Sequence, residues 1–527
     1  MIRLDCSRLA LILTATAMPL AHAQLTDRTQ TPNTESAGIV KSLQQQIGAG
    51  VGDIMTPGSS TYIIARDPAR SIRRGRQLFQ RKFTADQGFG PRAGVRDGTG
   101  NIETQAALGA GLVDSCAGCH GRPRGAAGAG GDVVTRPDSR DAPHLFGLGL
   151  QEMLGDEMTT ELRAIRERAI ADARSLGRAV SYPLVAKGVR FGSISATPNG
   201  AIDTAGVRGV DRDLRVRPFF AHGGTATIRE FVVGAFNDEM GLQAVDPLLA
   251  EAAAGARVTT PSGMVIDGAR DRVSAPPAKY AMDDPDGDGM RNEIPASLVD
   301  HMEFYLLNYF KPATYRSTPL AQVGLNIMKQ IGCTSCHVQN LRVEHDRRVA
   351  DVETAFDATR GIFNNLYATA SLQLTENDDL SGLPTIKRPN LRPFIVENFF
   401  SDLKRHDLGA AFHERNFDGT ITREFVTEPL WGVGTTAPYG HDGRSINLRE
   451  VILRHGGEAQ TSRNAFAGLP DIAKLAVMEY LNTLVLFPPD DTASNLDPGN
   501  PAAPAFPQRG HGSIRLPVLF NDPTELE

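Results

Sequence analysis

The chain has 527 residues, a length that favours two or three domains with separate cores. With 41% hydrophobic and 22% charged residues, its composition is ordinary for a soluble protein. The formal net charge of -6 gives no reason to expect nucleic acid as a partner, and no apolar run after the N-terminus reaches membrane-spanning length. We therefore expect no membrane span in the mature chain.

The N-terminal residues have the pattern of an export signal. A charged start is followed by an apolar run that ends at Leu20, and residues 21–23 read Ala-His-Ala. This order is typical of a signal peptide that is cut after Ala23. We expect a periplasmic or secreted protein that loses Cys6 with the signal. The mature chain then keeps four cysteines: Cys116, Cys119, Cys333 and Cys336.

Both cysteine pairs belong to Cys-x-x-Cys-His motifs, at residues 116–120 and 333–337. In such a motif the thiols bond the vinyl groups of a porphyrin, and the adjacent imidazole binds the iron. Two disulfides are the alternative use of four exported cysteines, whereas structural zinc would need four ligands around one ion. Because the motif occurs twice and uses every mature cysteine, it predicts two covalently bound c-type haems with His120 and His337 as proximal ligands.

The pattern along the chain indicates mainly helical structure. Helical periodicity begins near residue 74, recurs over 153–174 and 318–332, and returns over 471–487, while alternating strand patterns are scarce. We predict a mainly α fold with two cytochrome-c-like haem domains packed together, loop-rich insertions and few strands. The predicted segments are a signal peptide (1–23), a polar lead-in (24–65), an N-terminal haem domain (66–315), a C-terminal haem domain (316–490) and a tail (491–527).

An acidic loop lies between the two motifs. Asp284, Asp286 and Asp288 occupy alternate positions and Gly289 lets the chain turn, which offers the hard oxygen ligands that calcium prefers. Pro295 stands where an EF-hand loop has its terminal glutamate, so that motif is incomplete. The loop is therefore either a calcium site or a solvated acidic turn.

A segment of the N-terminal half is partly repeated in the C-terminal half. With one residue of slack, His222 aligns with His441 and Ala235 aligns with His455. If this segment covers the distal face of each haem, His455 makes the second iron six-coordinate, while Ala235 leaves the first iron open to peroxide or dioxygen. His222 and His441 would fix turns or contact haem propionates; distal ligation by His222 is the alternative, and it would close the first site.

From about residue 74 to 487 the chain resembles the di-haem cytochrome c peroxidase and MauG superfamily, and within it the di-haem oxidoreductases, to which the rubber oxygenases are related. Besides the two haem motifs, the resemblance rests on residues 219–224 (FFAHGG), 227–231 (TIREF), 234–242 (GAFNDEMGL), 429–432 (PLWG), 437–444 (APYGHDGR) and 454–459 (RHGGEA).

The resemblance implies roles for residues beside the irons. His455 occupies the position of the distal ligand of the electron-transferring haem, and Glu239 occupies that of an acid beside the reactive haem. A carboxylate there can move a proton between the two oxygens of peroxide. The chain departs from the family where Phe231 replaces a glutamine and Ala221 replaces a tryptophan. A phenyl group makes a dry pocket, which suits dioxygen.

These observations predict an exported di-haem oxidoreductase, with peroxidase-type activity as the first hypothesis. Its expected partners are peroxide or dioxygen and a small periplasmic cytochrome or cupredoxin, and we expect a monomer. The alternatives are a haem-dependent dioxygenase that cleaves an apolar alkene such as polyisoprene, and a non-catalytic electron carrier. Trp431, the single tryptophan, either assists electron transfer between the haems or belongs to the core. We expect His406 to contact a propionate or the backbone.

Overall fold

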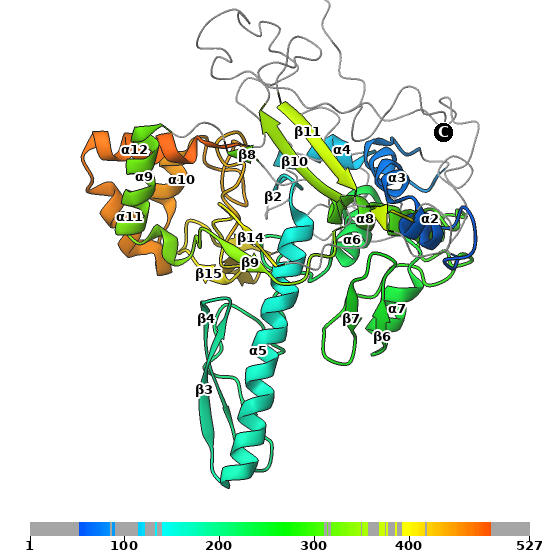
Figure 1. The fold of residues 1–527 in the computed structure, drawn as a ribbon, viewed down its shortest axis with the longest axis horizontal. Helices are drawn as coiled ribbons and strands as arrows, with labels where there is room; N and C mark the ends of the chain where they lie inside the picture. Colours follow the sequence, from blue (N-terminus) through cyan, green and yellow to red (C-terminus); the bar gives the residue numbers. More distant parts are fainter. Residues whose placement is uncertain are drawn as a thin grey trace, which may run out of the picture.

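A computed structural model describes residues 52–84, 87–89, 114–121, 132–133, 140–309, 313–314, 318–348, 350–356, 368–374, 376–377, 385–386, 393–416 and 419–485 (Figure 1). The predicted signal peptide, most of the lead-in and the C-terminal tail lie outside these residues. Within the described ranges, no helix combines the length and the apolar character that crossing a bilayer requires.

Helices form the framework of the described chain. In chain order they are α2 (Ser60–Arg66), α3 (Pro68–Gln80), α4 (Cys116–His120), α5 (Leu148–Leu176), α6 (Ile228–Met240), α7 (Pro247–Ala253), α8 (Ala296–Leu307), α9 (Pro319–Gln330), α10 (Leu448–Arg454), α11 (Gln460–Ala467) and α12 (Asp471–Leu481). The periodic segments at 153–174 and 318–332 are confirmed as helices α5 and α9.

The strands pair in small antiparallel sheets. One sheet has the order β3 (Val180–Ala186), β4 (Val189–Ala196), β5 (Ile202–Asp203). The two-stranded pairs are β1 (Asp132–Val133) with β2 (Arg140–Asp141), β6 (Arg257–Thr259) with β7 (Val265–Asp267), β8 (Ala313–Thr314) with β19 (Leu484–Val485), β9 (Leu341–Val343) with β14 (Phe394–Val396), β10 (Ala350–Phe356) with β11 (Ala368–Leu374), β12 (Glu376–Asn377) with β13 (Thr385–Ile386), β15 (Arg405–Asp407) with β18 (Glu424–Val426), and β16 (Glu414–Arg415) with β17 (Ile421–Thr422).

Strands are therefore more numerous than the sequence predicts. Most of them have only two or three residues. A strand that short cannot display the alternation of apolar and polar residues by which a strand is recognised in a sequence. The expectation of few strands is wrong for this reason, although the strands add little to the helical framework that holds the site.

The N-terminal unit, formed by α2, α3, α4, α6 and α8, has a core of its own. Helix α2 begins at Ser60, inside the segment predicted as a polar lead-in, because Ser59 caps it and Ile63 and Ile64 are buried. Helices α3 and α8 touch at Gly75, where an added Cβ would lie 2.3 Å from the carbonyl oxygen of His301. A glycine is needed there because the two backbones come so close.

The C-terminal unit, formed by α9 to α12, has a second core. Thr318 caps α9 by accepting a hydrogen bond from the N–H of Ala321. Gly324 brings α9 against α12, since a Cβ there would lie 2.0 Å from the carbonyl oxygen of Ala476. Helix α12 ends at Leu481, earlier than the periodicity up to residue 487 predicts.

Helix α5 contacts α8 of the N-terminal unit and strand β9 of the later part of the chain, and it projects as an arm with the β3–β4–β5 sheet along its side (Figure 1). At the base of the arm, Glu152 accepts a hydrogen bond of 2.7 Å from the N–H of Ile228, the first residue of α6. An oxygen of the same carboxylate lies 2.7 Å from the guanidinium of Arg347, which belongs to the C-terminal part of the chain. The buried Glu152 thus fixes the start of α6 relative to the C-terminal part of the chain.

Candidate functional site

Both Cys-x-x-Cys-His segments line one cavity of about 490 Å³ between the two units. Helix α4 supplies the first segment and the turn after α9 supplies the second. The lining includes the predicted attachment cysteines, the predicted iron ligands and the two predicted catalytic residues: Cys116, Cys119, His120, Phe231, Glu239, Cys333, Cys336, His337 and His455. Residues from distant parts of the sequence are therefore brought to one site.

Short helical turns present the two motifs to this cavity. Ser115 caps α4, with its hydroxyl oxygen accepting from the N–H of Gly118 at 3.1 Å. In the second motif, Gly332 adopts a φ of +87° before a single 3₁₀ turn over Cys333–Ser335. In both cases the chain turns tightly enough to bring its two cysteines and the histidine to the same cavity.

Three histidines of the cavity share one orientation. Each donates its Nδ1–H to a backbone carbonyl: His120 to Pro143 (2.7 Å), His337 to Phe400 (3.0 Å) and His455 to Val451 (2.7 Å). A hydrogen bond at Nδ1 selects the tautomer in which Nε2 carries the lone pair, as in histidines that bind a metal through Nε2. This arrangement is compatible with metal binding through Nε2 at each of the three imidazoles.

Burial keeps these imidazoles neutral. Desolvation lowers the pKa of His120 to about 4, and it lowers the pKa of His337 to about 4, with a smaller contribution from the nearby His455. Desolvation also lowers the pKa of His455. A neutral imidazole is the form that binds a metal, so the environment favours ligation at neutral pH.

The structure corrects the register of the internal repeat. A turn closed by an isolated antiparallel bridge precedes both α6 and α10, and a side chain caps each helix. The equivalent pairs, which all differ by 220 in residue number, are Phe219 and Tyr439, Thr225 and Ser445, and Thr227 and Asn447. His222 therefore corresponds to Asp442, and His441 to Ala221. The alignment of His222 with His441, which allowed one residue of slack, is wrong.

The match of Ala235 with His455 keeps this same offset. Helix α6 continues past Ala235 to Met240, whereas α10 ends at Arg454 and leaves His455 as its C-cap, with φ of -56° and ψ of 121°. The change of backbone direction at His455 lets its ring fold back onto the carbonyl of Val451. One copy of the repeat thus presents an imidazole to the cavity where the other presents a methyl group.

The remaining repeat histidines have structural partners. His222 is exposed, stacks on Phe220 with ring centres 6.2 Å apart, and lines a separate surface pocket. It does not belong to the lining of the haem cavity as far as the chain is described, so the geometry does not favour distal ligation by His222. His441 lies 2.9 Å from a Glu414 carboxylate oxygen and stacks on Phe425 at 3.9 Å.

The first haem motif faces an apolar part of α6. The Phe231 ring lies 5.4 Å from that of Phe220 and 6.0 Å from that of Phe219. Glu239, two turns further along α6, also lines the cavity. Burial raises the pKa of Cys119 to about 11, and the charge of Glu239 adds to this effect, which places the carboxylate close to the motif.

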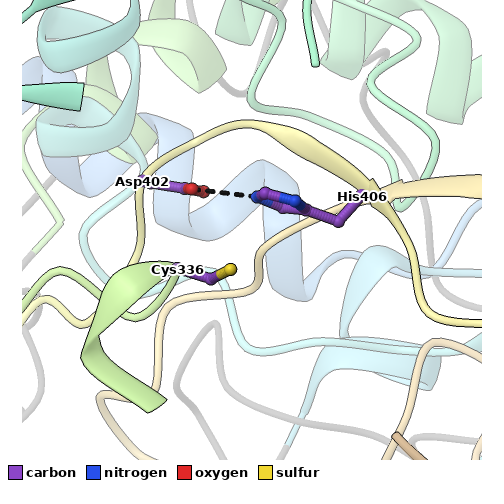
Figure 2. A group of neighbouring side chains, drawn as sticks. All are labelled: Cys336, Asp402 and His406. Carbon is purple, nitrogen blue, oxygen red and sulfur yellow. Dashed lines mark hydrogen bonds and ion pairs between the residues drawn. The ribbon is translucent and has the colours of Figure 1, made fainter. Parts of the chain in front are cut away.

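Cys336 of the second motif forms a cluster with Asp402 and His406, with potential ligand atoms within 4.8 Å of one another. Figure 2 shows the carboxylate of Asp402 meeting the His406 ring, with the Cys336 sulfur beside the pair. The two ring nitrogens of His406 lie 2.9 Å from Asp402 and 2.8 Å from Glu458. Because each nitrogen faces a carboxylate oxygen, both nitrogens are engaged in hydrogen bonds and neither is directed at a metal.

These contacts favour the protonated form of His406 over a role as a metal ligand. Burial opposes its charge, but the hydrogen bond to Asp402 raises the pKa of His406 above its usual value. The ring nitrogens of His406 contact two carboxylate side chains and not the backbone, while a contact with a haem propionate stays a prediction. Asp402 lies only four residues before His406 in the sequence, whereas Glu458 is 52 positions away and is brought to the ring by the fold.

His144 and Glu428 also line the cavity, and the sequence analysis predicted no role for either of them. His144 donates Nε2–H to the carbonyl oxygen of Trp431 at 2.9 Å. The buried Nδ1 of His144 and the buried Nε1–H of Trp431 have no hydrogen-bond partner among the described residues. Buried polar atoms normally have partners, so their place in the cavity lining fits a site for a polar group such as a haem carboxylate. Glu428 also faces the cavity, and desolvation raises its pKa to about 7.

The acidic loop lies apart from this cavity. The carboxylates of Asp284, Asp286 and Asp288 lie within 4.8 Å of one another, as a calcium site requires. Asp284 also accepts hydrogen bonds from the N–H groups of Gly287 (3.0 Å) and Gly289 (3.1 Å), as in a solvated turn. Calcium binding therefore stays a prediction.

A sequence comparison bears on the second half of this site. Residues 337–484 match the family model described as "Di-haem oxidoreductase, putative peroxidase". The match supports the di-haem oxidoreductase family. That family description implies haem cofactors and a peroxidase-like oxidoreductase. The matched segment contains His337, Trp431 and His455, whereas His120 and Glu239 lie outside it. No curated protein matches the chain.

Proposed function

We propose that this chain is an exported oxidoreductase with two covalently bound c-type haems and peroxidase activity. The observation that carries the proposal is the shared cavity, in which His120 and His337 stand beside their cysteines with Nδ1 bonded to a carbonyl and Nε2 available. The family match over residues 337–484 supports the same chemistry.

The proposal includes two cytochrome-c-like domains. In each unit a helix that precedes the haem motif crosses a later helix at a glycine, at Gly75 in α3 and at Gly324 in α9. In each unit a capped helix with an Arg-Glu pair, at residues 229–230 and 449–450, follows an equivalent turn. These correspondences support a duplicated haem-binding unit. The units differ at the position of Ala235 and His455.

That difference supports a division of labour. His337 and His455 would ligate one iron from opposite faces, which suits electron transfer, whereas His120 would ligate the other iron and leave its distal face open. When bound, the haem would supply the redox-active iron. Glu239 would accept a proton from one oxygen of peroxide and return it to the other, while Phe231 excludes water from the same space.

An oxygenase is the second candidate, and the aromatic side chains near Ala235 favour it. Phe219, Phe220 and Phe231 form an apolar cluster beside the first haem motif, and all three line the cavity. A phenyl group does not hydrogen-bond to peroxide as the family's glutamine would. The cluster instead offers an apolar surface to an alkene chain.

The first experiment is expression together with a cytochrome c maturation system, followed by measurement of the haem content per chain. We expect two covalently attached haems. Absorption and EPR spectra with and without cyanide then report the coordination of each iron. If the protein is a peroxidase or an oxygenase, we expect the spectrum of one haem to change with cyanide. Two six-coordinate haems whose spectra do not change with cyanide would exclude both enzymes and favour the non-catalytic electron carrier.

A second experiment separates the two enzymes. Peroxide turnover with a reduced small cytochrome or cupredoxin is compared with oxygen uptake in the presence of polyisoprene. We expect the first assay to be positive. Oxygen uptake that depends on the alkene, without peroxide turnover, would replace the peroxidase by the oxygenase. N-terminal sequencing of the exported protein, with Gln24 expected as its first residue, tests export.

A further inference from the structure

We propose that electrons pass between the two haems along a continuous backbone and hydrogen-bond route in which the His144 side chain is the only side-chain link apart from the two proximal histidines. The inference rests on the proposed function, because it requires haems held by His120 and His337. It assigns a role to His144, which lies outside both haem motifs and outside the internal repeat.

The first half of the route starts at His120. Its Nδ1–H donates to the carbonyl oxygen of Pro143 at 2.7 Å. Pro143 is covalently bonded to His144, whose Nε2–H donates to the carbonyl oxygen of Trp431 at 2.9 Å. Two short hydrogen bonds and one peptide bond therefore carry the route from the proximal ligand of the first haem to the segment that contains Trp431.

The second half leads on to His337. Leu430, which is bonded to Trp431, donates its N–H to the carbonyl oxygen of Phe399 at 3.2 Å. The next residue, Phe400, accepts the Nδ1–H of His337 at 3.0 Å. Every step between the two proximal imidazoles is thus a covalent bond or a hydrogen bond, without a gap through space.

The packing around the route holds its members in place. Trp431 is only 4% exposed, and its ring meets that of Phe399 at 4.9 Å in an edge-on contact. Gly147 lies under the indole, so closely that a Cβ on this residue would be 2.7 Å from the ring. His144 itself is held by the Trp431 carbonyl at one nitrogen, while its other nitrogen has no partner among the described residues. Breaking that single bond would therefore interrupt the route.

The transfer is balanced as a one-electron step. The haem held by His337 is oxidised by one electron, which it regains from a reduced redox protein, and the haem held by His120 is reduced by one electron. Each N–H of the route keeps its hydrogen, so no proton moves along it. Peroxide is the final oxidant: it accepts two electrons, one per passage, together with two protons from the solvent, and leaves as water.

The test measures the rate of electron transfer between the haems in the loaded protein. In the half-reduced protein, carbon monoxide bound at the open haem is removed by a laser flash, and the absorbance of both haems reports the electron as it moves. The variants are His144→Leu, which removes the donor, and His144→Gln, whose amide N–H can reach the same carbonyl. Trp431→Phe is the control, because it keeps the backbone carbonyl and an aromatic ring against Phe399.

We expect His144→Leu to slow the transfer by about tenfold, equivalent to ~1.4 kcal/mol in the barrier. His144→Gln should recover most of the rate, and Trp431→Phe should stay close to the parent. An unchanged rate in His144→Leu would overturn the proposal. A transfer rate that falls in Trp431→Phe but not in His144→Leu would also overturn the proposal, because the electron would then pass through the indole.

Haem content, carbon monoxide binding and the midpoint potential of each haem are measured first in every variant. A parent protein that lacks two haems, or that does not bind carbon monoxide, contradicts the proposed function, and it does so before any rate is recorded. A variant with two haems and unchanged potentials isolates the route, since a merely structural role of His144 would shift the spectra or the potentials as well.

Discussion

The backbone of Gly147 packs against the indole of Trp431. Replacing Gly147 by alanine tests whether the indole is rigidly held. Gly147 precedes α5 with a φ of +76°, in the left-handed region that side chains disfavour. A Cβ there would lie 2.7 Å from both Cη2 and Cζ2 of the indole. Because Trp431 is 4% exposed and also packs against Phe399, its ring has little room to retreat.

The expected cost follows from two separate effects. The left-handed backbone costs an alanine roughly 1–2 kcal/mol. Forcing a methyl group into a packed contact costs about 1–3 kcal/mol more. Gly147→Ala should therefore lower the free energy of unfolding by about 2–5 kcal/mol. Gly177, at the other end of α5, has a similar φ of +63° but nothing within 4 Å of an added Cβ. Gly177→Ala should therefore lower the free energy of unfolding only by the cost of the left-handed backbone, roughly 1–2 kcal/mol.

The two variants are compared by denaturant unfolding of the haem-loaded protein. Trp431 is the single tryptophan of the chain, so its fluorescence reports directly on the contact that is altered. Far-ultraviolet circular dichroism follows the helices in parallel. Equal losses of stability in Gly147→Ala and Gly177→Ala would refute the reasoning, because they would mean that the indole moves aside without cost.

Three further predictions address the haem faces and the acidic loop. His455→Ala should give the second haem a five-coordinate spectrum, and an unchanged spectrum would show that a different residue is its ligand. Glu239→Gln should reduce peroxide turnover by about 10²- to 10⁴-fold with both haem spectra intact, and full activity would exclude proton transfer by this carboxylate. Calcium should raise the thermal unfolding temperature of the parent but not of Asp286→Ala, measured against magnesium as a control; the same response in both proteins would leave the loop a solvated turn.

The local parts of the structure were predictable because their signals lie close together in the sequence. The Cys-x-x-Cys-His motifs and helix α9, which begins after a threonine cap, are set by neighbouring residues. The repeated cap is also local, since Thr227 with Glu230 has its counterpart in Asn447 with Glu450. Most of the strands escaped prediction because they have only two or three residues, which cannot display a period of two.

The residue alignment predicted for the internal repeat was wrong in one part. Matching His222 with His441 required one residue of slack, and the shared residue type was the reason for choosing that alignment. The backbone places the turns and caps at a constant offset, which sets His441 against Ala221 and leaves His222 on the surface. Side-chain identity was a weaker guide than the turn geometry, which depends on hydrogen bonds between residues six positions apart, such as Phe219 and Thr225.

The sequence by itself predicted two haem attachment sites, and it determined which histidines stand next to the cysteines and that one copy of the repeat has a histidine where the other has an alanine. Only the tertiary structure decided how those histidines are oriented, because the carbonyl that fixes His337 lies 63 positions away along the chain. The contact of His144 with Trp431 joins residues 287 positions apart. Such pairs depend on how α5 and the two cores pack, and no local pattern encodes that packing.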